Sequence, residues 1–228
     1  MLVALLTGLL AGALHVWSGP DHLAAIAPLA LQQQRRPWLV GVRWGIGHST
    51  GVALVGALSL LLREILPVER LSAWGERLVG VMLIGIGLWG VRRALEIKVH
   101  LHQHTHDGSA HAHAHVHAAR VPHEQTGAHV HTHAAVGIGV VHGLAGSSHF
   151  LGVLPVLALP TMAAAAGYIG AFAVGTIASM GAFAGMMGLF AARPAFHGQS
   201  AYRALLFLCS GAAMAVGVFW LVMAAGHG

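Results

Sequence analysis

The sequence predicts an all-α polytopic membrane protein. Its six transmembrane helices should form two inverted three-helix repeats, in which helices 1 and 4 are broken. Of the 228 residues, 56% are hydrophobic and only 8% are charged, which is too little charge to cover the surface of a soluble protein. A polar motif also occurs twice within apolar sequence, and a histidine-rich segment lies between the two copies. These three observations together predict the fold class.

The apolar segments are long enough to cross a bilayer, which takes about 17–25 residues in a helix. Six segments meet this length, at roughly 2–31 with the break inside it, 38–62, 78–97, 134–159, 163–192 and 203–225. Together they use nearly the whole chain. The sequence therefore leaves no room for a soluble catalytic domain, and we do not expect an enzyme.

The repeated motif places two histidines seven positions apart around a glycine, with a proline six positions beyond the second histidine. Its copies are His15–Pro28 and His142–Pro155, which begin 127 residues apart. A repeated polar break in hydrophobic sequence indicates the binding site of a transporter built from inverted repeats. Because each half has an odd number of helices, the second half must enter the membrane from the opposite side.

A histidine-rich segment separates the halves. We expect residues 1–98 to form the first repeat, 99–133 a cytoplasmic loop and 134–228 the second repeat. The loop holds twelve histidines: His100, His102, His104, His106, His111, His113, His115, His117, His123, His129, His131 and His133. Low complexity of this kind is typical of disorder, and His-x-His spacing chelates borderline-soft divalent metals. We therefore predict a disordered metal antenna.

The basic residues indicate topology. The net charge is +5, but lysine and arginine concentrate at helix ends, in the first, third and fifth connections, rather than along one face. The positive-inside rule then puts these connections in the cytoplasm and both termini outside. We expect a multi-pass protein of the inner (plasma) membrane, with the lipid bilayer as partner and no nucleic acid.

The first copy of the motif must be broken before its histidines can meet. On an unbroken helix, His15 and His22 would lie roughly 10 Å apart along the axis. The run Ser18-Gly19-Pro20 supplies the break, since glycine adopts unusual backbone angles and proline disrupts the preceding turn. Asp21 follows directly, and an unpaired carboxylate is costly inside a membrane. This pattern predicts a cation at the break.

The candidate metal ligands are histidines and one aspartate within apolar segments: His15, Asp21, His22, His48, His142 and His149. Nitrogen-rich ligands suit nickel, cobalt or zinc, whereas magnesium and calcium prefer oxygen. The metal is expected as cargo, and no cofactor is expected. His48 alone fits an interhelical hydrogen bond equally well. His142 and His149 also fit a gating role, because Ser148 stands where the first copy has its aspartate.

Two stretches, His15-Val-Trp-Ser-Gly-Pro-Asp21-His22-Leu-Ala-Ala and Trp44-Gly-Ile-Gly-His48-Ser, resemble the nickel/cobalt transporter superfamily, in its urease-accessory and nickel–cobalt-resistance branch. The resemblance implies a polytopic permease for nickel and cobalt whose ligands include His15, Asp21, His22 and His48. The better-known nickel permeases have four residues between the first histidine and the Asp-His pair. This chain has five, Val16 to Pro20.

Two other classes of function stay open. One is a membrane metal receptor or accessory protein that delivers metal to a partner, such as a cytoplasmic metallochaperone. The other is an intramembrane metalloenzyme that uses the same ligands to activate water. The sequence favours neither import nor export.

Overall fold

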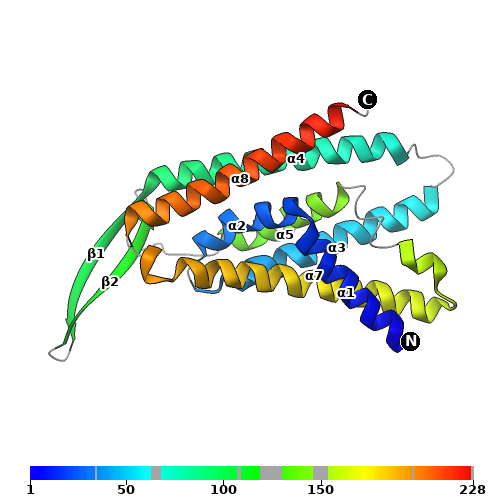
Figure 1. The fold of residues 1–228 in the computed structure, drawn as a ribbon, viewed down its shortest axis with the longest axis horizontal. Coiled ribbons are helices and arrows are strands. Elements are labelled where there is room, and N and C mark those ends of the chain that lie inside the picture. Colours follow the sequence, from blue (N-terminus) through cyan, green and yellow to red (C-terminus); the bar gives the residue numbers. More distant parts are fainter. Residues whose placement is uncertain are drawn as a thin grey trace.

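The computed structural model describes residues 1–33, 35–62, 68–106, 109–118, 130–145, 154–196 and 198–226. Apart from one hairpin, the described elements are helical (Figure 1). In chain order they are α1 (Leu2–Ser18), α2 (Pro20–Gln32), α3 (Pro37–Leu62), α4 (Val68–Glu96), β1 (Ile97–His106), β2 (Ser109–Ala118), α5 (Val130–Leu144), η1 (Leu154–Ala158), α7 (Met162–Ala191), η2 (Pro194–Phe196) and α8 (Gln199–Ala225).

Several of the described helices suit a bilayer. By length and composition, three stretches in the described part of the chain qualify as membrane spans: Trp74–Glu96, Met162–Ala191 and Gln199–Ala225. The pair α1 and α2 makes a fourth if it is counted as one span bent by 74°. The predicted break in the first helix is thereby confirmed. The expected total of six spans remains a prediction.

The distribution of polar and apolar side chains is that of a protein in lipid. Large apolar residues on the outside include Val3, which is 73% exposed, and Leu189, which is 74% exposed. Polar groups lie inside instead, and both His48 and His142 are fully buried. A soluble domain would show the opposite arrangement. The helices therefore face an apolar solvent and enclose a polar interior.

The two halves of the chain pack reciprocally. Helix α1 contacts α7, and α3 contacts both α5 and α7, while α4 lies along α8 (Figure 1). The first helix of each half thus packs on the second helix of the other half, and the third helices pack on each other. This is the contact pattern that a two-fold relation between inverted repeats would produce.

Close glycine contacts repeat this relation at the level of single residues. A Cβ at Gly12 of α1 would collide with the carbonyl oxygen of Phe172 and lie 3.0 Å from the amide nitrogen of Thr176, both on α7. Only glycine permits such an approach between helices. The crossing of α1 and α7 therefore depends on this small residue.

The crossing of α5 and α3 has the same design. A Cβ at Gly139 would collide with the carbonyl oxygen of Trp44 and lie 3.1 Å from the amide nitrogen of His48. Gly139 lies 127 residues after its counterpart on α1, the same offset that separates the motif copies. This close crossing brings the backbone of α5 against the part of α3 that carries His48.

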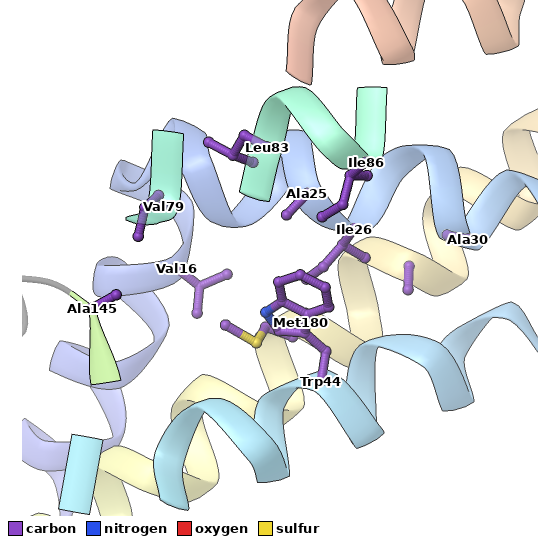
Figure 2. Close-up of a cluster of buried hydrophobic side chains, with 11 residues drawn as sticks. Val16, Ala25, Ile26, Ala30, Trp44, Val79, Leu83, Ile86, Ala145 and Met180 are labelled. Carbon is purple, nitrogen blue, oxygen red and sulfur yellow. The ribbon is translucent and has the colours of Figure 1, made fainter. Parts of the chain in front are cut away.

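The short helix α2 lies at the centre of the bundle, in contact with α3, α4, α7 and α8. Its apolar side chains join the main core (Figure 2). Ala25 lies toward Leu83 of α4, and Ile26 lies toward Trp44 of α3 and the neighbouring α7. Burial on several sides fixes the position of α2.

The C-terminal end of α2 is also anchored by hydrogen bonds. The hydroxyl of Tyr202, at the start of α8, donates to the carbonyl oxygen of Leu31 at 2.5 Å. The side-chain amide of Gln32 donates to the carbonyl oxygen of Pro28 at 3.1 Å. Carbonyl groups at a helix end have no partner within the helix, so these bonds satisfy groups that would otherwise be costly to bury.

The histidine-rich segment departs from the expectation of a disordered loop. Residues Ile97–His106 and Ser109–Ala118 pair as an antiparallel hairpin that projects from the helices (Figure 1). The physical reason is the strict alternation of histidine with other residues, a period of two that matches a strand. Helix α5 also begins at Val130, four positions before the expected residue 134.

We expect Gly139→Ala to destabilise the bundle, because its Cβ would force α3 and α5 apart. Overpacking of this kind costs about 1–3 kcal/mol. Thermal unfolding of the purified protein in detergent measures the effect. The matched control is Gly137→Ala on the same helix, where a Cβ would meet nothing within 4 Å. Equal melting temperatures for the two variants would contradict the close crossing.

Candidate metal centre

The centre is built around the break between α1 and α2. Helix α1 ends at Ser18, and Gly19 is extended, with φ −92° and ψ 99°. Pro20 is the first residue of α2, where its missing N–H costs nothing because the first amides of a helix have no internal partner. The chain turns by 74° at this point. The turn brings His15 and His22 within reach of each other.

Gly19 is needed for the space that it leaves rather than for its backbone angles, which other residues also adopt. A Cβ there would collide with Nδ1 of His22 and lie 3.0 Å from Oδ1 of Asp21. The first turn of α2 therefore folds its own side chains back over the break.

Asp21 lies between two histidines from opposite halves of the chain. Nδ1 of His22 donates to Oδ1 of Asp21 at 3.1 Å. Nε2 of His142, on α5, lies 3.1 Å from Oδ2 of the same carboxylate. All three side chains are buried, with Asp21 only 5% exposed. The carboxylate also sits in the first turn of α2, where the helix dipole favours negative charge.

A second group of ligands adjoins the first. His15, His22 and His48 each offer a ring nitrogen, and these nitrogens lie within 4.8 Å of one another. The ring centroids of His15 and His22 are 4.7 Å apart, and those of His22 and His48 are 4.9 Å apart. Three different helical segments thus contribute one imidazole each.

Two overlapping sets of potential ligands result, one of three nitrogens and one of Asp21, His22 and His142. Both sets contain His22. Ligands around a tetrahedral zinc ion lie roughly 3.4 Å apart, given metal–nitrogen distances of about 2.0–2.1 Å. Small side-chain movements would therefore close either set on an ion.

The structure brings together five of the six predicted ligands, His15, Asp21, His22, His48 and His142. The remaining one, His149, lies outside the described residues. The sequence left open whether His142 binds metal or gates. Its contact with Asp21 places it in the cluster itself.

Sequence reasoning missed the side chains that frame the cluster. Phe172 of α7 lies against His15, with ring centroids 5.6 Å apart, and the ring of Trp44 lies 5.9 Å from that of His142. Trp44 and Phe172 are 128 residues apart, almost the offset between the two motif copies. Extending the repeat search beyond the motif would have paired these two aromatic residues.

Fold and site together define a class: a helical protein suited to a membrane, with a buried histidine–aspartate cluster at a helix break. Among curated proteins, the chain is similar to chloroplast protein FOR GROWTH AND FERTILITY 1 of Arabidopsis thaliana, with 39% identity over 159 residues. FOR GROWTH AND FERTILITY 2 from the same plant is 36% identical over 159 residues. Each alignment covers 69% of this chain but only 42% and 40% of the respective plant proteins.

A more distant similarity links the chain to urease accessory protein UreH of Bacillus sp. (strain TB-90). The two are 29% identical over 151 residues, which cover 64% of this chain and 60% of UreH. No protein-family model matches the chain, and no solved structure matches it.

We expect Gly19→Ala to weaken metal binding without unfolding the helices, because the added methyl group would displace His22. Disturbing the groups that orient a metal ligand typically costs about 10–100-fold in affinity, and we expect at least the lower figure. Calorimetric titration with nickel chloride measures the change. The control is Gly211→Ala on α8, where a Cβ would meet nothing within 4 Å. Unchanged affinity in Gly19→Ala would argue against ligation by His22.

Proposed function

We propose that the chain is a multi-pass membrane carrier for a divalent transition-metal cation, with nickel or cobalt favoured and zinc next. We place it in the inner (plasma) membrane, with the lipid bilayer as its surroundings and the ion as its substrate. The observation that carries this proposal is the buried cluster at the helix break, to which both halves of the chain contribute.

The energetic cost of the cluster supports a functional role. A charged side chain at the centre of a membrane helix costs about 2.5–3.5 kcal/mol on insertion scales. Among the residues that the structure describes, Asp21 is the only buried carboxylate. Four imidazoles surround it in two overlapping groups. A purely structural role would be met by apolar packing at lower cost, so we infer that these groups serve a ligand.

The donor set favours the late first-row metals. Imidazole nitrogen suits nickel, cobalt and zinc, while one carboxylate is too few oxygen ligands for magnesium or calcium. The similarity to UreH agrees with the resemblance to the nickel/cobalt transporter superfamily. Membership of that superfamily and the choice of metal are both part of the proposal.

The shared ligand His22 suggests how an ion would move. Two divalent ions about 5 Å apart would repel each other by about 13 kcal/mol at an effective dielectric constant of about 20. The cluster would therefore hold one ion at a time. That ion can pass between the two sets by exchanging His15 and His48 for Asp21 and His142, while His22 stays bound.

A second candidate is a membrane metal receptor or accessory protein that hands the ion to a cytoplasmic metallochaperone. The printed name of UreH, an accessory protein, favours keeping it. An intramembrane metalloenzyme ranks lower. It would need a general base beside the metal, and the buried carboxylate within the described residues already contacts two histidines.

Nickel flux into proteoliposomes loaded with a metal-sensitive dye tests the carrier. We expect saturable flux in the wild type, and Asp21→Asn to reduce it to below about a tenth, because the amide loses the charge that binds the ion. Glu96→Gln is the matched control, since it removes an exposed carboxylate that pairs with Arg92 away from the cluster.

A variant that lacks residues 99–129 distinguishes the two candidates. In a carrier, flux continues and mainly the apparent affinity falls. In a receptor, flux is absent from every variant and deletion of the segment abolishes metal delivery. Saturable flux that survives in Asp21→Asn would move the transport site away from the helix break.

We expect His22→Ala to weaken nickel binding at least about tenfold more than either His48→Ala or His142→Ala, because both ligand sets lose a member only in the first variant. Calorimetry on the detergent-solubilised protein measures all three affinities. Equal losses in the three variants would indicate one fixed site rather than two overlapping sets.

A further inference from the structure

The hairpin β1–β2 has a register that places histidines opposite one another. The strands pair antiparallel from Ile97↔Ala118 at the base to His106↔Ser109 at the tip. Within this register three pairs of partners are both histidine: His100↔His115, His102↔His113 and His104↔His111. These pairs alternate with pairs that contain no histidine.

Alternate positions of a strand belong to the same face of a sheet. One face of the hairpin therefore holds positions 98, 100, 102, 104 and 106 of β1 and positions 109, 111, 113, 115 and 117 of β2. Eight of these ten positions are histidine, the exceptions being Lys98 and Ser109. The other face has no histidine and consists mainly of alanine, valine, leucine and isoleucine.

The sequence between the strands supports this register independently. The pair His106↔Ser109 leaves two positions for the connection, and the residues at those positions are Asp107 and Gly108. Asp-Gly is among the dipeptides preferred in two-residue hairpin loops, because both positions of the favoured turn require positive φ. A loop of this length fixes the register of the two strands.

We propose that the histidine face of this hairpin is a second metal-binding site, on which divalent transition-metal ions bridge the two strands. Directly opposed positions have Cβ atoms about 4.5–5.5 Å apart, and the next position on the same face is about 6.8 Å away along the strand. An opposed pair together with the next rung therefore offers three or four imidazoles to one ion.

The bridge and the hairpin support each other. An isolated two-stranded hairpin is marginally stable in water, and ligands that are brought together only in the folded state couple metal binding to folding. The ions therefore hold the strands in register. Four-coordinate ions are typical of nickel-like and zinc sites, so eight histidines accommodate about two ions. This site is separate from the helix break and does not require that the protein transports metal.

The test moves histidines between faces without changing composition. A shifted variant exchanges three neighbouring pairs in β2: Ala110→His with His111→Ala, Ala112→His with His113→Ala, and Ala114→His with His115→Ala. The three histidine pairs are then lost, because the strands carry their histidines on opposite faces. A disordered chelator would not notice this exchange.

A compensated variant adds the corresponding exchanges in β1: His100→Leu with Leu101→His, His102→Gln with Gln103→His, and His104→Thr with Thr105→His. In the observed register, positions 101 and 114, 103 and 112, and 105 and 110 are partners. This variant therefore restores three opposed pairs on the other face of the hairpin.

All variants are made in the full chain carrying Asp21→Asn and His22→Ala, so that the helix break does not contribute. Calorimetry with nickel chloride should show about two ions in the unshifted protein. Affinity should fall at least about tenfold in the shifted variant and return to within about threefold in the compensated one. Amide hydrogen exchange in residues 97–118 should slow on adding nickel, except in the shifted variant.

Two results would overturn the proposal. Equal affinities in the unshifted, shifted and compensated proteins would show that the histidines bind metal without regard to register. Failure of nickel to slow amide exchange in residues 97–118 would show that metal does not stabilise the hairpin. Since transport is not measured, neither result depends on whether the helix break carries an ion.

Discussion

The buried carboxylate of Asp21 is the constraint on which the rest of the helical bundle depends. A charged group in an apolar interior must have partners, and its two oxygens face His22 and His142. One partner is local and requires the helix to restart just before Asp21. The other comes from the second half of the chain and requires α5 to reach the centre. The break and the approach of the two halves therefore answer the same electrostatic demand.

Glycines make that approach possible. At Gly12 and Gly139 the helix backbones come so close that a single methyl group would collide with a carbonyl of the neighbouring helix. Helices in lipid associate through such packing, because burial of apolar surface gains little when the solvent is itself apolar. The same crossings set the positions of His48 and Thr176, so packing and ligand geometry are linked.

The two histidine-rich regions illustrate different ways to hold a metal ion. At the helix break, single imidazoles from separate helices are fixed by a buried framework, which suits discrimination among ions. In the hairpin, the ligands repeat along two strands that have little framework of their own, which suits capture of several ions. A chain with both could concentrate metal at one end of the bundle and select it at the centre.

Several features could be predicted from the sequence because their signals are local. The break at Gly19 and Pro20 was predicted correctly, and helices α3 and α7 lie within one residue of the expected segments. The strand alternation was equally local, but low complexity was given more weight than periodicity, so the hairpin was missed. Only the tertiary structure decided that His142 contacts Asp21 and that His22 belongs to both ligand sets. Those contacts join residues far apart in the chain, and they depend on where helices cross, which no local pattern specifies.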